Sequence, residues 1–479
     1  MAEKIRWLEW GKEAFERAKK ENKPILMDIF GTWCHWCHRI EQDTYEKPEV
    51  IEDVNKNFVA IRVDTDQRPD INERYNQGGW PSTVFLDHDG EIITGATYIP
   101  PQQMLSLLDQ VKLVFKKRGK IIPPKPLAKK RGVVTEEILL SMEEVVKRSF
   151  DPVYGGFGEP KFPMTEVLEF LLARFEKTKQ KELLDMVEKS LQGMIAGIFD
   201  TVEGGFFRYS VTQDWKLPHY EKMLETNSGL VRVLSYFYKI TKKEKYLEAL
   251  KKTISYMLNT LSDKNGGFYS SQDADGEEKY YGKGMEERRK LPTPSIDKNM
   301  YADLNGLAIR SFLAYFEIST DKKIKEFIEK TIDFILKGPY SKEKGIAHYF
   351  EGKPQFLGLL RDNLNIALAL LEAYRVFNKK EYLEKTQEIA GFILKNFHDK
   401  KEGGFFDKLE GGMGKLAMRN KIIGENAKVA ILLFELEEIL NKKEYQKIAE
   451  GALEIFAVDF KVYGLLAGEY ALAAQKILE

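Results

Sequence analysis

The chain has 479 residues, with 74 Lys and Arg balanced by 74 Asp and Glu, so its formal charge is zero. This balance gives no support for nucleic-acid or membrane partners, and 43% hydrophobic residues are typical of a globular protein. So long a chain exceeds one ordinary hydrophobic core, which predicts at least two domains. Residues 1–6 carry no apolar leader and no apolar run near 18 residues follows, so we expect a cytoplasmic protein.

Both cysteines lie within one short segment, Trp33-Cys34-His35-Trp36-Cys37-His38. The C-x-x-C spacing is short enough for a local disulfide. In a reducing compartment such a pair indicates redox chemistry or metal binding rather than a structural bridge. Zinc held by the two cysteines and a neighbouring histidine is one alternative, although a structural site needs four ligands. An inert pair is the other alternative.

The segments around the cysteines predict an α/β domain. Residues 24–30 predict a buried strand, a break follows at 31–32, and residues 39–46 predict a helix. This order places Cys34 at a helix N-terminus, where the helix dipole lowers the pKa of a thiol. Further expected elements are strands at 58–64, 82–86 and 91–93 and a helix at 103–117.

Residues 25–37 resemble the active-site segment of thioredoxin. The resemblance implies that Cys34 is the nucleophile and Cys37 the resolving cysteine. It also implies that Asp28 is the buried carboxylate that helps to deprotonate the resolving thiol. Pro81 matches the proline that faces the disulfide in cis form in that fold.

Inside the motif the usual Gly-Pro pair of thioredoxin is replaced by His35-Trp36. A protonated His35 would stabilise the Cys34 thiolate and make the disulfide more oxidising. We place Trp33 and Trp80, which adjoin the first cysteine and Pro81, in the same expected catalytic site.

Residues 116–131 contain three prolines and eight basic residues but no acidic residue. Such a stretch is typical of a stiff, solvated linker. We therefore expect a thioredoxin-like domain at 1–117, a linker at 118–132 and a second domain at 133–479.

The second domain carries a helical repeat. Twelve amphipathic segments alternate between short charged turns and long glycine-rich turns, the latter at glycines 155, 204, 266, 345, 403 and 464. Six helix hairpins with their long connections at one rim predict an (α/α)6 toroid, and an open solenoid is the alternative. The varied long turns favour the toroid, because functional insertions collect at a cavity rim.

Such toroids resemble the six-hairpin glycosidases and the N-acylglucosamine 2-epimerases, which implies a cavity lined by aromatic and acidic side chains. Candidate residues for a carbohydrate-like ligand are Arg208, Tyr209, Trp215, His219, Glu221, Lys222, Asp273, Asp275, Arg361 and Asp362. Residues 273–276 also allow a plain turn or a weak calcium-like loop. We assign no metal ligands and no cofactor.

Motifs of both domains together resemble the thioredoxin-domain proteins of the spermatogenesis-associated protein 20 type. They lie at residues 34–38, 68–70, 78–81, 155–163, 208–210, 219–224 and 273–275. The resemblance implies an α/β thioredoxin-like domain followed by an all-α (α/α)6 toroid, and it implies no settled reaction.

Two classes of function remain open at this point. The first is a thiol-disulfide oxidoreductase that acts on a protein disulfide or redox partner, with the toroid selecting the substrate. The second is a non-redox binding module for a carbohydrate or peptide, or a sugar epimerase or hydrolase that acts within the toroid. Neither class involves nucleic acid or a membrane.

Overall fold

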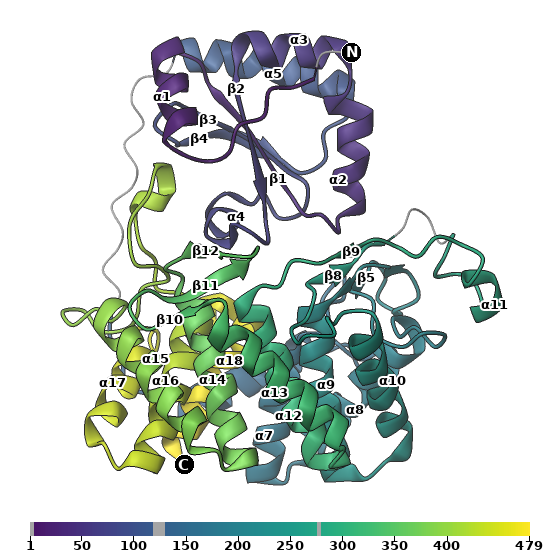
Figure 1. Cartoon of the computed structure of the whole chain (residues 1–479), viewed down its shortest axis with the longest axis vertical. Helices are drawn as coiled ribbons and strands as arrows, with labels where there is room; N and C mark the ends of the chain where they lie inside the picture. Colours follow the sequence, from purple (N-terminus) through teal and green to yellow (C-terminus); the bar gives the residue numbers. More distant parts are fainter. Residues whose placement is uncertain (1–3, 118–129, 275–278) are drawn as a thin grey trace. The chain divides into compact units, whose positions relative to one another are not determined.

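The computed structural model of the chain describes residues 4–117, 130–274 and 279–479 (Figure 1). The chain divides into two compact units, one of residues 1–127 with 410–419 and one of residues 128–409 with 420–479. The predicted linker at 118–132 lies outside the described residues up to residue 129. Residues 410–419, which the sequence assigns to the helical domain, group with the first unit.

The first unit is built on a mixed four-stranded sheet in the order β2-β1-β3-β4. The central strand β1 runs parallel to β2 and antiparallel to β3. The strands are β1 (Ile25–Phe30), β2 (Val59–Asp64), β3 (Ser82–Leu86) and β4 (Ile92–Ala96). The helices are α1 (Lys12–Glu21), α2 (His35–Ile40), α3 (Pro48–Asn57), α4 (Pro69–Tyr75) and α5 (Pro101–Lys117). This arrangement confirms the predicted thioredoxin-like fold.

Side chains of β1 alternate between two apolar clusters, one on each face of the sheet. Leu26 packs with Phe85 and Leu108 on one face, whereas Met27 packs with Val84 on the other. Alternation along a strand sends residue 28 to the same face as residue 26. The sequence therefore places a carboxylate, Asp28, on the face of the sheet that carries the apolar cluster of Leu26.

The second unit contains twelve long helices among its described residues, arranged as six hairpins. The inner helices are α7 (Thr165–Thr178), α9 (Leu224–Thr241), α12 (Ala302–Ser319), α14 (Leu360–Phe377), α16 (Ile423–Leu440) and α18 (Gly468–Leu478). The outer helices are α6 (Glu136–Ser149), α8 (Lys181–Gly197), α10 (Glu244–Asn259), α13 (Lys322–Lys337), α15 (Lys380–Asn396) and α17 (Lys443–Glu454). A short helix, α11 (Met285–Arg288), lies in the third long connection.

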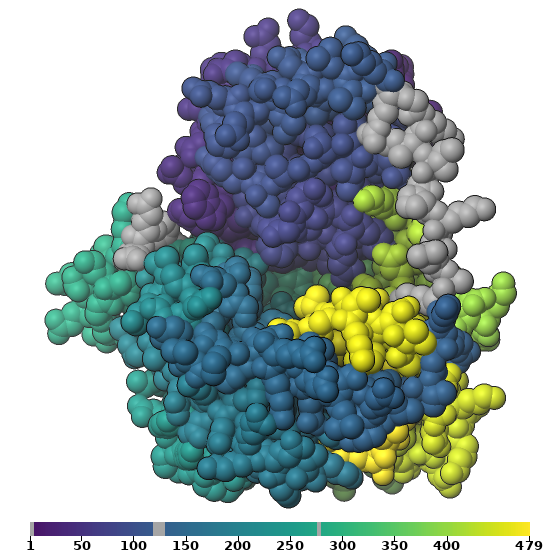
Figure 2. All heavy atoms as spheres, turned by 180° about the vertical axis from the view of Figure 1, so that it is seen from behind, coloured from purple at the N-terminus to yellow at the C-terminus, as the bar shows by residue number. Residues whose placement is uncertain are grey.

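The inner helices close into a ring, because each one contacts the next and α18 returns to α7. Figure 2 shows the C-terminal residues in yellow set against the first helical residues in blue. Short strands line the long connections: β5 (Tyr209–Ser210), β6 (Pro218–His219), β7 (Lys222–Met223), β8 (Ser271–Gln272), β9 (Ile296–Asp297), β10 (Tyr340–Ser341), β11 (Gly345–Phe350) and β12 (Pro354–Leu357). The closed ring confirms the toroid and excludes the open solenoid.

A repeated asparagine ties four of the long connections to the inner helices that follow them. Asn305 in α12 accepts the backbone N–H of Phe268 at 2.7 Å and donates to its carbonyl at 3.0 Å. Its amide also donates to the carbonyl of Tyr301 at the start of the helix. Equivalent asparagines, which receive the corresponding backbone N–H, are Asn227, Asn363 and Asn426.

A lysine and an aspartate hold three of the glycine turns. Lys222 donates to Asp200 at 2.7 Å and to the carbonyl of Gly204 at 2.8 Å. The same pattern joins Lys161 to Asp151 and Lys421 to Asp399. A side chain at Gly204 would collide with the carbonyl of Lys252, and the φ of this glycine is +84°. The turn therefore requires glycine, and most Gly-Gly-Phe segments belong to the frame of the toroid.

Candidate functional site

The two cysteines form a disulfide at the start of α2. Cys34 is the N-cap residue of this helix, and its sulfur accepts the backbone N–H of Cys37 at 3.1 Å. Exposed fractions are 3% for Cys34 and 6% for Cys37. A sulfur at this position lies where the helix dipole and an amide N–H both favour a thiolate after reduction.

Aromatic side chains surround the disulfide segment. Trp33 packs edge-on against Trp80 at 5.6 Å between ring centroids and donates its indole N–H to Asp66 at 2.7 Å. The peptide bond between Trp80 and Pro81 is cis. Trp36, inside the motif, is 47% exposed and contacts His35 and Tyr98. The motif thus presents one large apolar ring to solvent beside nearly buried sulfurs.

Asp28 is fully buried and lies between charged and polar neighbours on the adjacent strands. The sheet register aligns it with Arg62 on β2 and with Thr83 on β3. Arg62 donates to its carboxylate at 3.0 Å and also pairs with Glu41. The guanidinium of Arg62 also lies 4.7 Å from the centre of the Trp7 ring, so this ring covers one side of the guanidinium.

Burial raises the pKa of Asp28 to about 6, and the nearby Arg62 only partly offsets this effect. The hydroxyl of Tyr45 lies 3.5 Å from the same carboxylate and 3.0 Å from Thr83. A carboxyl group with a pKa near neutrality can both accept and release a proton. Asp28 therefore has the ionisation that a proton acceptor for a buried thiol needs.

The sequence analysis did not single out Glu41, Tyr45 or Arg62. Helix α2 continues into a π-helical turn at Glu41–Tyr45, and this turn carries two of the three residues. Such turns are frequent at functional sites, but no sequence pattern predicts this one. Arg62 could have been found, because it is a charged residue between Ile61 and Val63 in the interior of the predicted strand at 58–64.

In the second unit, Tyr209 and His219 face each other across the small sheet of β5 and β6. Their rings stack at 4.4 Å, and Phe162 covers the other face of Tyr209 at 4.5 Å. The guanidinium of Arg208 lies 5.8 Å from the same ring. Three of the predicted ligand-binding residues are therefore brought together here.

Glu221 is the fourth predicted residue at this place. It is 2% exposed, and one carboxylate oxygen lies 3.4 Å from Nδ1 of His219. Burial, followed by the charge of Glu221, raises the pKa of Tyr209 to about 12. The arrangement joins an aromatic stack to a carboxylate, a combination that suits a polyol or sugar ring.

Trp215 and Lys222 lie inside the protein. Trp215 is fully buried, and its ring fills the space beside Gly156, Gly193 and Gly197. Lys222 is also fully buried, within the glycine-turn frame. Burial lowers the pKa of Lys222 to about 8, although Asp200 opposes this effect. Both residues therefore occupy structural positions.

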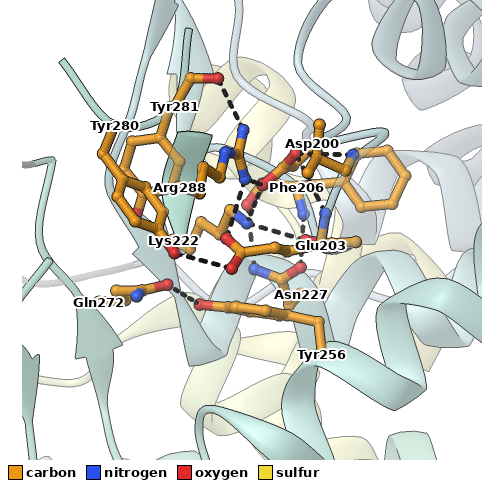
Figure 3. A network of polar contacts seen from close by, with 12 residues as sticks. Asp200, Glu203, Phe206, Lys222, Asn227, Tyr256, Gln272, Tyr280, Tyr281 and Arg288 are labelled. Atoms are coloured by element: carbon orange, nitrogen blue, oxygen red, sulfur yellow. Dashed lines mark hydrogen bonds and ion pairs between the residues drawn. The ribbon is translucent and has the colours of Figure 1, made fainter. Parts of the chain in front are cut away.

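Figure 3 shows Lys222 and Arg288 converging on Asp200. Arg288 is buried, 2.7 Å from Asp200 and 2.8 Å from Glu203. Tyr280 donates to Glu203, and the ammonium of Lys222 lies 4.3 Å from the ring centre of Tyr256. All charges in this network are paired, so it anchors the third long connection to the second.

The other predicted ligand-binding residues that the structure describes contact partners outside the Tyr209 stack. The carboxylate of Asp273 accepts the hydroxyl of Ser295 and the N–H of Ala274. Asp275 is outside the described residues. Arg361 donates to Glu425 at 3.2 Å, and Asp362 pairs with His348 at 2.8 Å.

Each inner helix carries an acidic residue in its first turn: Glu166, Glu225, Asp303, Asp362, Glu425 and Glu469. Acids at helix starts are common because they complement the helix dipole. Three of these acids are also buried, since less than a tenth of the surface of each whole residue is exposed at Asp303, Asp362 and Glu425. His348 of β11, which the sequence analysis missed, lies against two of them.

The spacing of these acids from the repeated asparagines is a signal that sequence reasoning could have used. Glu225 and Asp303 precede their asparagines by two residues, and Asp362 and Glu425 precede theirs by one. Alignment of the four helix starts on the asparagine would have grouped these acids. His348 lies outside this spacing pattern, on β11.

Comparison with known proteins supports both halves of this description. A family described as Thioredox_DsbH, protein of unknown function DUF255, matches residues 1–125. The uncharacterized protein B0495.5 of Caenorhabditis elegans is 28% identical over 93% of this chain and 79% of its own length. Spermatogenesis-associated protein 20 of Mus musculus is 33% identical over 57% of this chain.

Over 57% of its length the chain is similar to spermatogenesis-associated protein 20. The resemblance predicted from the motifs is thereby confirmed. The alignment covers 39% of the length of the mouse protein. The similarity therefore concerns part of that protein only.

The helical unit is similar to solved sugar-enzyme toroids. Cellobiose 2-epimerase of Spirochaeta thermophila matches 72% of this chain and 98% of its own, with a TM-score of 0.56 and 14% identity. A GH76 α-mannanase of Bacteroides thetaiotaomicron matches 71% of this chain and 96% of its own, with a TM-score of 0.52 and 13% identity. At such identities the likeness shows the fold alone.

Within the described part of the chain, no helix combines the length and the apolar character that a bilayer crossing needs.

Proposed function

We propose that the chain is a thiol-disulfide oxidoreductase and that Cys34 is its nucleophile. The observation that carries the proposal is the position of the Cys34–Cys37 pair at the N-terminus of α2 in a thioredoxin-like unit. The pair can close reversibly without rearrangement of distant parts of the chain, because the cysteines are three residues apart.

In the proposed reaction the Cys34 thiolate attacks a substrate disulfide, forms a mixed disulfide and releases one substrate thiolate. The Cys37 thiolate then attacks the Cys34 sulfur, which releases the second substrate thiolate and closes the Cys34–Cys37 disulfide. Two electrons pass from the dithiol to the substrate. Asp28 takes the proton from Cys37, a role supported by its burial and its pKa of about 6. The predicted cytoplasmic location would supply the dithiol form.

The decisive experiment measures reduction of a protein disulfide by the full chain and by two serine variants. Cys34→Ser should reduce turnover to the uncatalysed rate. Cys37→Ser should accumulate a mixed disulfide that is visible by mass spectrometry. The reversible midpoint of the parent in glutathione buffers should lie in the range of thioredoxin-fold enzymes, about −270 to −120 mV. Unchanged turnover in Cys34→Ser would contradict the proposal.

A second candidate is supported by the stack of Tyr209 with His219 beside Glu221 and by the toroid fold that the chain shares with sugar epimerases. We propose a carbohydrate-like ligand at this stack, either as a recognition element of the oxidoreductase or as the substrate of an epimerase or hydrolase. Ligand-observed NMR with a panel of reducing disaccharides tests it. Binding should be lost in Glu221→Gln and kept in Cys34→Ser. A panel without any binder would contradict this candidate.

A further inference from the structure

Three side chains of the second unit meet at one place. Two come from the starts of inner helices and one from a hairpin strand. Asp303 belongs to α12, Asp362 to α14 and His348 to β11. One donor atom from each lies within 4.8 Å of the other two. Among the described residues this is the one group of three such side chains that is close enough to share an ion.

The cluster is buried and rich in negative charge. Asp362 is fully buried and His348 is 1% exposed. Nδ1 of His348 lies 2.8 Å from one oxygen of Asp362 and 4.0 Å from Asp303. Two carboxylates that share one imidazole leave a net negative charge in a poorly hydrated place, which is costly without a further cation.

One oxygen of this cluster has no hydrogen-bond partner among the described residues. It is Oδ2 of Asp362, on a side chain with no exposed surface. Buried carboxylate oxygens normally accept hydrogen bonds or bind a cation. The neighbouring cation, Arg361, reaches toward Glu425 at 3.2 Å, so its charge is shared with another acid.

The frame of the toroid fixes the spacing of the three side chains. Asn363, the residue after Asp362, accepts the backbone N–H of Ile346 at 2.9 Å, two residues before His348. This bond ties α14 to β11 beside the two ligands. Asn305 in turn anchors the helix start that carries Asp303. The donors are therefore held by backbone contacts independent of their own charges, as a preorganised binding site requires.

We propose that Asp303, His348 and Asp362 bind one divalent transition-metal ion. Imidazole nitrogen with carboxylate oxygen favours zinc or manganese over magnesium or calcium, which prefer oxygen alone. Bonds of about 2.0–2.2 Å allow two donors of one ion to lie at most about 4.4 Å apart. The side chain of Asp303 is 13% exposed and that of Asp362 is not exposed at all, so Asp303 has room for the small rotation that closes the site.

Three protein ligands leave further positions on the ion for water or a ligand, as in catalytic rather than structural metal sites. The ion would replace the proton between His348 and Asp362 and neutralise both carboxylates. The site is independent of the proposed redox reaction, because none of its ligands is a cysteine. It departs from the sequence analysis, which assigned no metal ligand.

The test uses the full chain with Cys34→Ser and Cys37→Ser, so that thiols cannot bind zinc. After treatment with a chelator, the protein is titrated with Zn²⁺, Mn²⁺ or Mg²⁺ by calorimetry and then desalted for elemental analysis. We expect one Zn²⁺ or Mn²⁺ per chain and at least tenfold weaker Mg²⁺ binding. The pulsed EPR spectrum of bound Mn²⁺ should show coupling to one imidazole nitrogen.

Two ligand variants and one matched control complete the design. His348→Gln and Asp303→Asn should each weaken Zn²⁺ binding at least tenfold, whereas His398→Gln, which changes a histidine of another repeat, should leave it unchanged. Asp303→Asn alters the most exposed ligand, so it reports even where the buried histidine variant fails to fold. A folded parent that binds no ion, or equal binding in Asp303→Asn, would overturn the proposal.

Discussion

The two reactive cysteines of the thioredoxin-like unit are three residues apart along the chain, whereas Asp303 and Asp362 of the helical unit are about 60 residues apart. Cys34 and Cys37 meet because one turn of helix brings them together. The two aspartates meet because successive inner helices of a closed ring lie side by side. A local motif identifies the first site, and only a closed fold assembles the second.

The two regions also differ in what their repeated residues do. In the helical unit the recurring residues are structural, such as the asparagines that hold the long connections and the lysines that hold the glycine turns. Side chains that break the repeat add to the recurring acids Asp303 and Asp362 as candidates for function. His348 lies on a hairpin strand of the fourth connection, and Tyr209 with His219 forms a stack on the second.

Asn305→Ala tests the structural side of this comparison and should have the largest effect. It leaves the N–H and the carbonyl of Phe268 buried without their partner. At about 1–3 kcal/mol for each group, the helical unit should lose about 4 kcal/mol of stability. Urea unfolding followed by circular dichroism at 222 nm measures the loss.

The exposed Asn259 offers a matched control, since Asn259→Ala removes only a bond to Ser255. This variant should stay within about 0.5 kcal/mol of the parent. Disulfide reduction should be unchanged in the folded protein of both variants. Equal stability of Asn305→Ala and Asn259→Ala would contradict a structural role for the asparagine frame.

Asp28→Asn tests the ionisation of the thiol site and should have the next largest effect. The pKa of Asp28 is raised from 3.8 to about 6 in the folded chain, so its protonated form favours folding most below pH 4. This contribution is lost as the pH rises through 6, at a cost of about 2–3 kcal/mol by pH 8. The amide avoids the cost and can still accept a hydrogen bond from Arg62.

The variant should therefore be more stable than the parent at pH 8 and equal to it at pH 4. Tryptophan fluorescence follows this unit, because five of the six tryptophans lie within residues 1–127. Release of the mixed disulfide should also slow in Asp28→Asn, since Cys37 loses its proton acceptor. A stability difference that does not change with pH would contradict the raised pKa.

Much of this architecture is readable from the sequence because its signals are local. The C-x-x-C segment follows an apolar strand, and the helical periodicity with its glycine turns predicts six hairpins and a ring. Trp215 has the residue type and loop position of a ligand-binding aromatic. Its burial depends on space left by Gly193 and Gly197 on another element, and no local pattern reveals such packing.

The electrostatic partners are harder to predict for the same reason. Arg62 reaches Asp28 only through the register of two parallel strands, and Tyr45 reaches it through a π-helical turn. The asparagine spacing shows that part of the second site was present as a repeat signal. His348 was not part of that repeat signal, because it lies on the hairpin of β11 and β12 and not at the start of an inner helix.

Trp36→Ala should have the smallest effect and tests how the thiol site meets its substrate. Trp36 is 47% exposed, and the centre of its ring lies 5.4 Å from that of Tyr98. Its loss should change stability little, because exposed substitutions rarely exceed about 0.5 kcal/mol. An exposed aromatic ring beside a reactive pair is typical of a contact with a protein partner. We expect kcat/KM for a protein disulfide to fall about three- to tenfold, whereas reduction of a small aromatic disulfide should change less than twofold.

Val462→Ala, at a residue that is 80% exposed in the helical unit, controls for the loss of an exposed apolar side chain. If both substrates slow equally in Trp36→Ala, the ring acts on the cysteines rather than on the partner, and the substrate contact must be sought on other residues of the thiol site.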